Sequence, residues 1–508
     1  MPCKNLQRLT IVFSIGLALS SCARTERTAS TSAPQPTGAA ELIQLGNRTQ
    51  NLGGLESALD QLFLGPEYAS AHWGVRIETL EGELIYDHQG DKAFMPASQL
   101  KVFTTAAALD LLGPDFRYET RVELHGEQQG STFVGDLVIV GSGDPSLGAW
   151  HGKGVQDSSA VLPTWIAALQ ERGIEKIDGR IIGDGRVFTD EFFNTDWHYG
   201  DLPYWYAAGT SGLAMEENAF RCEIIPGKQI GDLATVTWNP NTRYIDVLIE
   251  TKTVGKDEVS TADSFNFNTE GNTIYFGGQI PIDKIVKERA SIWDGPRYAA
   301  FLLKEECERQ GLMVTGDAVN LRAIQTVDFN RTVSLLLTHQ SPPLSELCSV
   351  INKVSHNFFA DQLVRTLGYK VGKEGSFKEG TRVVRDWLQS REIPNPAVFR
   401  MVDGSGLSTG NRFTPVQATT LYRSLFYDSR IGEPFYASLP ERKTDTETYA
   451  VHAKSGFIGG VRTLGGYLEI APGETVVFSL MCNLFNGSAR DVSNTQDKAL
   501  EILADELQ

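Results

Sequence analysis

Hydrophobic and polar positions give the region between residues 42 and 116 the pattern of an α/β core. Apolar side chains recur every three to four residues over Leu55–Phe63, which predicts a helix. Strands are predicted over His72–Thr79 and Glu83–Asp87, joined by a Glu-Gly turn. A run of small apolar residues then predicts a buried helix from Pro96 to Gly113, because proline favours a first helical turn and Gly-Pro ends the helix.

The pattern changes between residues 117 and 335, where strand signals recur between turns rich in Gly, Asn and Asp. The predicted strands are Tyr118–His125, Thr132–Gly141, Lys176–Gly183, Ala234–Trp238, Tyr244–Thr251, Asn272–Phe276 and Ala318–Arg322. One clear helix, Pro296–Gln310, interrupts them. We expect a β-rich insertion that forms two subdomains.

Helical periodicity returns after residue 336. The predicted helices are Leu344–Lys353, Asn357–Leu367, Lys378–Ser390, Pro415–Phe426 and Arg490–Leu507, and the predicted strands are Thr446–Ala453, Arg462–Ile470 and Thr475–Asn483. Because this pattern complements that of the first region, we expect one α/β domain made of residues 42–116 and 336–508 and split by the insertion.

The first 41 residues have a pattern of their own. Two basic residues precede the apolar run Leu9–Leu19, which is long enough for a signal peptide and too short to span a bilayer. Leu19-Ser20-Ser21-Cys22 resembles a bacterial lipobox. We therefore expect a signal peptide over residues 1–21, lipidation at Cys22 and a flexible Ser/Thr/Pro-rich tether over residues 22–41. The alternative is an ordinary secretory signal with a chance cysteine.

Composition narrows the classes of function. A chain of 508 residues with 41% hydrophobic and 21% charged residues is typical of a soluble protein with two or three domains. The net charge of −17 argues against nucleic acid as a partner. The eight histidines form no metal-like pair, so we expect neither a metal nor a cofactor. The disulfide state stays open for the four remaining cysteines, Cys222, Cys307, Cys348 and Cys482.

The predicted helix at Pro96 carries the first candidate chemistry. Ser98 and Lys101 are three residues apart, so on a helix their side chains lie on one face. An amine in that position can take the hydroxyl proton of a serine nucleophile, and the helix N-terminus favours the alkoxide. The alternative is that Ser98 caps the helix and Lys101 is a solvated charge. The apolar residues after Lys101 make a solvated lysine harder to explain.

Two further motifs complete a pattern. Ser355-His356-Asn357 precedes a predicted helix, with Ser355 as a candidate N-cap, and Lys454-Ser455-Gly456 ends a predicted strand. Together with Ser98-Gln-Leu-Lys101 they match, in order, the Ser-x-x-Lys, Ser-x-Asn and Lys-Thr/Ser-Gly motifs of penicillin-recognising serine enzymes.

The long separation of the first two motifs resembles the class C low-molecular-mass penicillin-binding proteins, the D-alanyl-D-alanine carboxypeptidase/endopeptidase family (peptidase family S13). The segments that also resemble this family begin at Gly141, Ser211 and Asp403. The resemblance implies a penicillin-binding transpeptidase-like domain, in which an antiparallel sheet is flanked by helices. Serine replaces the usual threonine at 455, and Thr409 stands where many members carry arginine.

The resemblance also implies roles. Ser98 would attack the carbonyl of the penultimate D-alanine, with neutral Lys101 as base, its pKa lowered by burial near Lys454. Ser355 would relay the proton to the leaving amine, and Asn357 would orient Lys101 and the substrate. Lys454 and Ser455 would bind the terminal carboxylate, and the N–H groups of Ser98 and Phe457 would form the oxyanion hole. The remaining candidates for substrate binding are Gly456, Ser405, Leu407 and Ser408.

Three alternatives remain in view. A β-lactamase would share the motifs but needs a group that activates the deacylating water, and no clear candidate is present. A non-catalytic peptidoglycan-binding scaffold would keep the fold without turnover. Gly406-Leu-Ser408-Thr-Gly410 fits the Gly-x-Ser-x-Gly motif of α/β-hydrolases, but the next helix begins only at Pro415 and the only downstream histidine is His452.

We therefore expect an exported D-Ala-D-Ala carboxypeptidase of the cell envelope or periplasm, lipid-anchored to a membrane at Cys22. Its expected partners are peptidoglycan stem peptides as substrates and β-lactams as inhibitors. Endopeptidase activity on peptide crosslinks is a further expectation. The sequence does not decide the balance between carboxypeptidase and endopeptidase activity.

Overall fold

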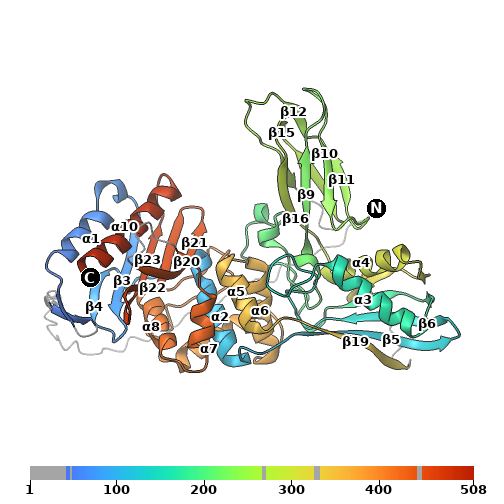
Figure 1. Ribbon diagram of the computed structural model, residues 1–508, viewed down its shortest axis with the longest axis horizontal. Helices are drawn as coiled ribbons and strands as arrows, with labels where there is room; N and C mark the ends of the chain where they lie inside the picture. The colour runs from blue at the N-terminus through green and yellow to red at the C-terminus, as the bar shows by residue number, and fades with distance from the viewer. Residues whose placement is uncertain (1–41, 46–47, 266–270, 325–331, 443–448, 508) are drawn as a thin grey trace, which may run out of the picture. The chain divides into compact units, whose positions relative to one another are not determined.

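A six-stranded antiparallel sheet joins the two ends of the chain. The computed structural model describes residues 42–45, 48–265, 271–324, 332–442 and 449–507. The sheet has the order β20-β21-β22-β23-β3-β4. Its strands are β3 (His72–Thr79), β4 (Leu84–His88), β20 (Glu441–Arg442), β21 (Ala450–Ile458), β22 (Val461–Ala471) and β23 (Glu474–Asn483). In Figure 1 the blue strands β3 and β4 lie beside the orange-red strands β21 to β23.

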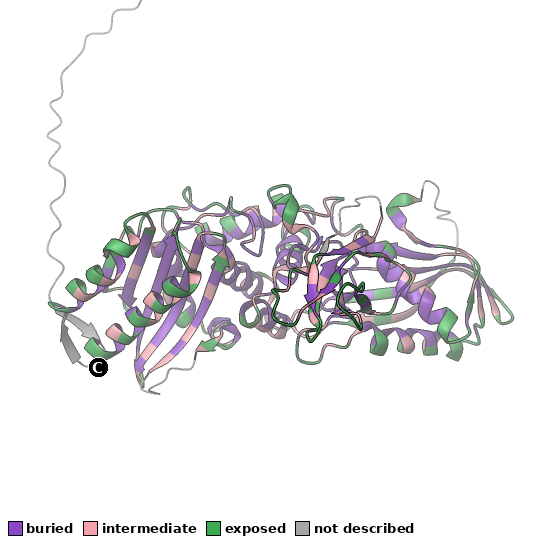
Figure 2. Ribbon diagram, turned by 90° about the horizontal axis from the view of Figure 1, so that it is seen from above, coloured by how far each residue is buried: buried purple, intermediate pink, exposed green. Residues whose placement is uncertain are grey.

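Strands β3 and β23 lie inside this sheet because their side chains are apolar on both faces. Their register pairs Val75 with Leu480, and alternate residues of β23 point to opposite sides. Val477 and Met481 pack into one core, whereas Phe478 and Leu480 pack into another. The sheet therefore needs a helical layer on each face, and Figure 2 shows its strands largely buried.

The first layer contains α1 (Leu55–Phe63) and α10 (Ala489–Leu507), which pack against each other, and α10 also packs against β22. The second layer begins with the 3₁₀ helix η2 (Ala97–Leu100) and α2 (Lys101–Leu112). It continues with α5 (Leu344–Lys353), α6 (Asn357–Lys370), α7 (Phe377–Ser390), α8 (Pro415–Phe426) and α9 (Gly432–Ser438). Helix α2 is buried from Lys101 to Leu109 because α5, α6 and α7 contact it around its circumference.

The insertion contains a second, mixed sheet with the path β17-β7-β6-β5-β19, to which β8 and β18 are added through β6. Its strands are β5 (Glu119–Gln129), β6 (Thr132–Val140), β7 (Lys176–Asp178), β8 (Ile181–Asp184), β17 (Met313–Val314), β18 (Ala318–Asn320) and β19 (Val333–Gln340). Helices α3 (Ser158–Glu171) and α4 (Gly295–Arg309) contribute to its core, where Trp165 and Tyr298 are buried.

Smaller sheets complete the insertion. They are formed by β9 (Ala219–Ile225), β10 (Thr235–Asn239) and β16 (Val286–Ser291), by β11 (Asp246–Ile249), β13 (Asp263–Phe265) and β14 (Thr273–Gly277), and by β12 (Lys252–Val254) and β15 (Gln279–Pro281). A separate hairpin pairs β1 (Leu42–Leu45) with β2 (Arg48–Asn51). The remaining 3₁₀ helices are η1 (Pro66–Tyr68), η3 (Tyr199–Asp201), η4 (Trp205–Ala207), η5 (Glu216–Asn218) and η6 (Leu321–Ala323).

The predicted fold class is confirmed, with local corrections. Strands β9, β16 and β19 of the insertion went unpredicted. Helix α3 went unpredicted, because Pro163 inside it conceals the helical pattern. The single strand predicted over Lys176–Gly183 is two strands, since at Gly179 the chain passes so close to Gly135 that a Cβ would lie 1.9 Å from its carbonyl oxygen. The strand predicted over Thr446–Ala453 is β21, which begins at Ala450 and continues to Ile458.

The domain boundaries stay predictions. Strand β19 pairs with β5 of the insertion and runs across residue 335, so the sheet does not end at the expected boundary. The predicted signal peptide, Cys22 and the tether lie outside the described residues. Within the described ranges, no helix combines the length and the apolar character needed to cross a membrane. The four cysteines left open above are all buried and free.

Candidate active site

Ser98 and Lys101 lie where η2 passes into α2. Ser98 is partly exposed, whereas Lys101 is fully buried. The Lys101 Nζ lies 2.9 Å from the Ser98 Oγ, 2.7 Å from the Asn357 Oδ1 and 2.5 Å from the Ser405 carbonyl oxygen. The last two atoms can only accept, so a neutral amine gives them its two N–H groups and turns its lone pair toward the Ser98 hydroxyl.

The amide of Asn357 is oriented by a second hydrogen bond. Its Nδ2 donates to the Tyr206 carbonyl oxygen at 2.8 Å, which leaves Oδ1 to face Lys101. Burial lowers the pKa of Lys101 to about 8, against the opposing effect of the Asp361 and Asp403 carboxylates. An amine with this pKa is partly neutral near neutral pH, as a general base must be.

Ser355 differs from its predicted position at the helix cap. His356 occupies the residue before α6 and makes no capping hydrogen bond through its side chain. Ser355 comes one residue earlier, with a φ of 60° in the left-handed region. Its Oγ accepts a hydrogen bond of 2.9 Å from the Nζ of Lys454. With this left-handed backbone, the Ser355 hydroxyl faces Lys454 and not the N-terminus of α6.

Lys454 lies in the middle of β21 and not at a strand end as predicted. The side chain is 1% exposed, and its Nζ also donates to the Ser455 carbonyl oxygen at 2.8 Å. Burial holds the pKa of Lys454 well below its ordinary value, and the nearby charges of Lys101 and Arg462 act in the same direction. An anion that binds beside Lys454 would favour its charged form.

Gly456 brings β21 against the helix that carries Ser98. A Cβ at this position would lie 2.5 Å from the Pro96 carbonyl oxygen and 2.4 Å from the Thr463 Oγ1. The hydroxyl of Thr463, from β22, donates to the same carbonyl at 2.8 Å. Glycine at position 456 therefore allows β21 to lie close to η2. The sequence alone did not reveal this structural reason for the glycine.

Two buried aspartates hold the loop that faces Lys101. The Asp361 Oδ1 accepts from the backbone N–H groups of Gly404 and Ser405 at 2.8 and 3.1 Å. Asp403 accepts from Gly406 N at 2.8 Å and Ser408 N at 2.6 Å. Burial, and then the Asp403 charge, raise the pKa of Asp361 well above its ordinary value.

Sequence reasoning missed Asp361 as a residue near the site. The signal was its spacing of four from Asn357, which places both residues on one face of α6.

The other candidate residues occupy varied environments. Ser405 is fully buried, and its carbonyl rather than its hydroxyl faces Lys101. Ser408 is 2% exposed and its hydroxyl donates to Asp196. Leu407 and Ser455 are partly exposed, and Phe457 is exposed. Their roles in substrate binding stay predictions.

The geometry argues against the α/β-hydrolase alternative. Its candidate nucleophile, Ser408, is buried and bonded to an aspartate, and α8 begins only at Pro415. His452 lies on β21 with its ring centroid 4.4 Å from that of Tyr436. A nucleophile elbow needs an exposed serine on a turn that leads directly into a helix.

A cluster of His151, Glu217 and His356 lies next to the Ser-His-Asn motif. Glu217 accepts from the His151 Nδ1 and the His356 Nε2, each at 2.9 Å. Among the described residues this is the group whose ligand atoms lie close enough to hold a metal, within 4.8 Å of one another. Each carboxylate oxygen has an imidazole partner, whereas the buried Nδ1 of His356 has no hydrogen-bond partner in the described part of the chain.

Comparisons with known proteins agree with this architecture. A D-alanyl-D-alanine carboxypeptidase from an Actinomadura species is 28% identical over 459 residues, which are 86% of this chain and 82% of that protein. A carboxypeptidase from Haemophilus influenzae is 25% identical over 419 residues, covering 79% of this chain and 83% of that protein. The crystal structure of penicillin binding protein 4 from H. influenzae has a TM-score of 0.74 at 23% identity, covering 89% of this chain and 98% of that chain.

The family model described as "D-Ala-D-Ala carboxypeptidase 3 (S13) family" matches residues 55–507, which include all three motifs and the insertion between them. Since the match extends over most of the sequence, the chain belongs to the D-Ala-D-Ala carboxypeptidase 3 (S13) family.

Proposed function

We propose that this protein is a serine-type D-Ala-D-Ala carboxypeptidase that removes the terminal D-alanine from peptidoglycan stem peptides through an acyl-enzyme. The observation that carries the proposal is the environment of the Lys101 amine, whose two acceptor partners leave its lone pair to the Ser98 hydroxyl 2.9 Å away. Family membership supports the same reaction class.

In the proposed mechanism, the Ser98 Oγ attacks the carbonyl carbon of the penultimate D-alanine while its proton passes to Lys101. The tetrahedral intermediate collapses when the C–N bond breaks, and the leaving amine of the terminal D-alanine takes up a proton through Ser355. Water then attacks the Ser98 ester and restores the serine, releasing the shortened peptide. The 2.9 Å contact of Ser355 with Lys454 supports this relay.

The terminal carboxylate of the substrate is the natural partner for Lys454. Burial disfavours the charge of this lysine, so an anion beside it would compensate. We assign Ser455 a hydrogen bond to the same carboxylate, and the N–H groups of Ser98 and Phe457 the oxyanion. Removing one such donor typically costs about 3–4 kcal/mol of transition-state stabilisation.

The decisive experiment is mass spectrometry of a crosslinked muropeptide after incubation with wild type and Ser98→Ala. We expect wild type to release D-alanine, and release of monomers would add endopeptidase activity. Ser159→Ala, which changes an exposed serine of α3, is the matched control and should behave like wild type. Equal product from wild type and Ser98→Ala would reject the mechanism.

A fluorescent penicillin separates this function from its alternatives. Stable labelling of Ser98 is expected of a carboxypeptidase that β-lactams inhibit. Rapid release of the label would indicate a β-lactamase, and absence of labelling a non-catalytic scaffold. The crystal structure of the H. influenzae protein in complex with a β-lactam makes labelling a reasonable expectation.

We further propose export to the cell envelope and lipid attachment at Cys22. The lipobox-like Leu19-Ser20-Ser21-Cys22 supports this proposal. Metabolic labelling with a radioactive fatty acid should mark the wild-type protein and not Cys22→Ala. Equal labelling of the two would reject the anchor.

A further inference from the structure

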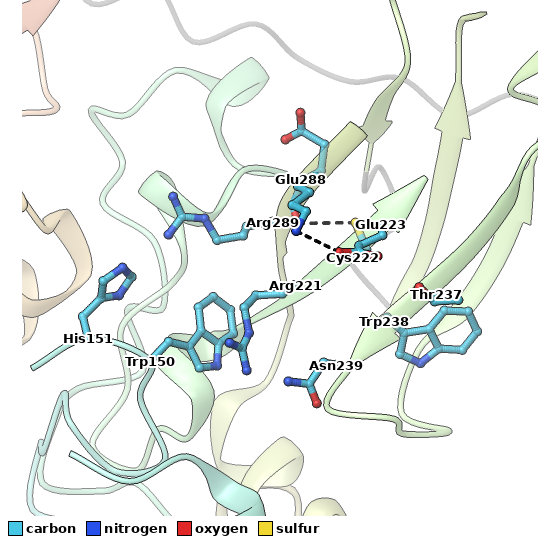
Figure 3. Close-up of a pocket in the computed structure, with 11 residues that line it drawn as sticks. Trp150, His151, Arg221, Cys222, Glu223, Thr237, Trp238, Asn239, Glu288 and Arg289 are labelled. Carbon is cyan, nitrogen blue, oxygen red and sulfur yellow. Dashed lines mark hydrogen bonds and ion pairs between the residues drawn. The ribbon is translucent and has the colours of Figure 1, made fainter. Parts of the chain in front are cut away.

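A cavity of about 650 Å³ lies against the sheet β10-β9-β16 of the insertion. Its walls include Trp150, Arg221, Trp238 and Arg289 and none of the three catalytic motifs. Figure 3 shows Arg221 lying along Trp150, with strand β10, which carries Trp238 and Asn239, on the opposite side. The cavity has no part in the mechanism above.

The strand register places two like charges directly opposite each other. Arg221 of β9 pairs with Arg289 of β16 and, on its other side, with Asn239 of β10. Two residues along the same face, Glu223 pairs with Lys287, and these opposite charges form an ion pair of 3.1 Å. Like charges directly opposite each other destabilise a sheet. The pairing of Arg221 with Arg289 therefore needs an explanation, whereas the Glu223–Lys287 ion pair does not.

Both guanidinium groups lie on aromatic rings without a carboxylate partner. The Arg221 Cζ is 4.7 Å from the ring centroid of Trp150, and the Arg289 Cζ is 3.6 Å from that of Trp205. Neither side chain forms an ion pair with any residue in the described ranges. The buried Nε of Arg221 has no hydrogen-bond partner in that part of the chain. Unused donors therefore remain on Arg221.

The nearby carboxylates are already occupied. Glu216 accepts hydrogen bonds from Trp150 and Ser158, and Glu217 accepts them from His151 and His356. The carboxylate of Glu288 points away from the two arginines in Figure 3. Burial lowers the pKa of Arg289; the charges of Glu217 and Glu288 oppose this shift, and the charge of Arg221 adds to it. An anion between the two arginines would relieve this repulsion.

We propose that this cavity binds a carboxylate of the peptidoglycan strand other than the terminal carboxylate of the substrate, held between Arg221 and Arg289. The proposal rests on the proposed function, because it takes peptidoglycan as the ligand. Two aromatic walls, Trp150 and Trp238, suit the sugar and peptide surfaces beside such a carboxylate.

Side chains packed next to the cavity connect it to the catalytic motifs. Trp205, under Arg289, has its ring centroid 5.5 Å from that of His356, the middle residue of the Ser-His-Asn motif. The next residue, Tyr206, accepts the hydrogen bond that orients the Asn357 amide. A strand bound in the cavity would thus be tethered near the catalytic residues.

The test measures binding by calorimetry, with a soluble disaccharide muropeptide whose stem peptide ends before the two D-alanines. This probe lacks the scissile bond, so its binding is measured without turnover, and the arginine variant shows which part of the binding belongs to the cavity. Wild type should bind it, and Arg221→Gln/Arg289→Gln should bind at least about tenfold more weakly, because charge-assisted hydrogen bonds are lost. The same probe with amidated carboxylates should lose about as much affinity for wild type.

The matched control is Lys228→Gln/Lys252→Gln, which removes the same number of charges from exposed positions of the insertion outside the cavity. Its affinity should equal that of wild type. Lack of binding by wild type, equal binding by the arginine variant, or indifference to amidation would each overturn the proposal. The single variants Arg221→Gln and Arg289→Gln keep the proposal testable if the double variant fails to fold, because each should bind the probe more weakly than wild type.

Penicillin labelling and hydrolysis of a short acyl-D-Ala-D-Ala substrate are measured on the same preparations. Both should be unchanged in the arginine variant, because neither compound reaches the cavity. Failure of these two reactions in wild type would count against the proposed function, whereas failure of muropeptide binding alone would count against the cavity.

Discussion

At the scale of single residues, the chemistry of the site depends on which atoms the buried Lys101 amine bonds to. Two acceptors, the Asn357 amide oxygen and the Ser405 carbonyl, take the N–H groups of Lys101. A protonated lysine would need the Ser98 oxygen as a third acceptor, and a neutral one can accept the Ser98 proton. The protonation state of Lys101 therefore sets the direction of the bond to Ser98.

This arrangement predicts a pH dependence. The pKa of Lys101 is lowered to about 8, so its base form is depleted as the pH falls below that value. We expect kcat/KM for a short D-Ala-D-Ala substrate to rise with pH, with a midpoint near 8, and to fall about tenfold per pH unit below it. The rate of acylation by penicillin, measured in parallel, should follow the same curve. A flat profile across this range would contradict Lys101 as the base.

Asp361 offers a way to move that midpoint. Its carboxylate raises the pKa of Lys101, so Asp361→Asn should shift the acidic limb of kcat/KM to lower pH while the amide oxygen still accepts from the Gly404 N–H. The measurement is the midpoint of the pH profile of kcat/KM. Asp386→Asn, an exposed acid of α7, is the control and should leave the midpoint in place. An unmoved midpoint in Asp361→Asn would show that this carboxylate does not act on Lys101.

Residue types and their order were enough to nominate Ser98, Lys101, Ser355, Asn357 and Lys454, because each motif is short and local. Sequence could not reveal what surrounds them. The positive φ of Ser355 and the carbonyl of Ser405 that faces Lys101 are backbone features, and no side-chain pattern encodes them. Asp361 was within reach through its helical spacing from Asn357.

At the scale of elements, the site is assembled where strand β21 crosses η2. Lys454 and Gly456 are two residues apart, so they lie on the same face of β21, toward the helix that carries Ser98. The absence of a side chain at Gly456 sets how closely β21 approaches η2.

Gly456→Ala should therefore separate the two elements. The added Cβ would clash with the Pro96 carbonyl oxygen and the Thr463 hydroxyl, which costs about 1–3 kcal/mol of stability by overpacking. Displacement of Ser98 from β21 should also lower the acylation rate by about tenfold or more. Thermal unfolding and penicillin acylation measure the two effects.

The control for this substitution lies in the same hairpin. Gly459→Ala adds the same methyl group at a position with nothing within 4 Å, so it should change neither unfolding nor acylation. If both alanine variants behave alike, the contact between β21 and η2 does not set the geometry of the site.

Helices and strands with a clear hydrophobic pattern were predictable in type. The observed bounds equal the predicted ones for α1, α5, α8 and β3. The predictions failed where tertiary contacts override the local pattern. Helix α3 tolerates Pro163, and β21 continues through Lys454, Ser455 and Gly456 because β22 supplies its backbone partners.

At the scale of the whole molecule, the insertion reaches the catalytic motifs through Glu217. This residue is the middle one of three successive residues with positive φ in η5 and is 2% exposed. It accepts a hydrogen bond from the His356 Nε2 inside the Ser-His-Asn motif. Interactions with His356 and His151 hold the pKa of Glu217 below its ordinary value despite burial, which opposes them.

Glu217→Gln should therefore destabilise the protein in a pH-dependent way. A carboxyl with a lowered pKa in the folded state stabilises it above the unfolded value of 4.5, and this contribution is lost as the pH falls below 4.5. We expect a loss of about 2–3 kcal/mol at pH 7, since charge-assisted hydrogen bonds are removed. The difference in unfolding free energy between wild type and variant should shrink in acid.

Denaturant unfolding at several pH values measures this difference. Glu308→Gln, at an exposed acid of α4, is the control and should show little change at any pH. A constant difference for Glu217→Gln across acid pH would mean that the carboxylate charge is not what stabilises the contact.

The pairing of β3 with β23 also has a consequence for how the protein is made. These strands lie side by side in the sheet, and Met95 bonds to Asn483 across 388 positions of sequence. Strand β3 can pair early with β4, but the ribosome must finish nearly the entire polypeptide before β3 gains its second neighbour, β23. A product truncated before β23 would leave that edge open and its serine unassembled, so premature termination should yield aggregation-prone fragments without hydrolytic activity.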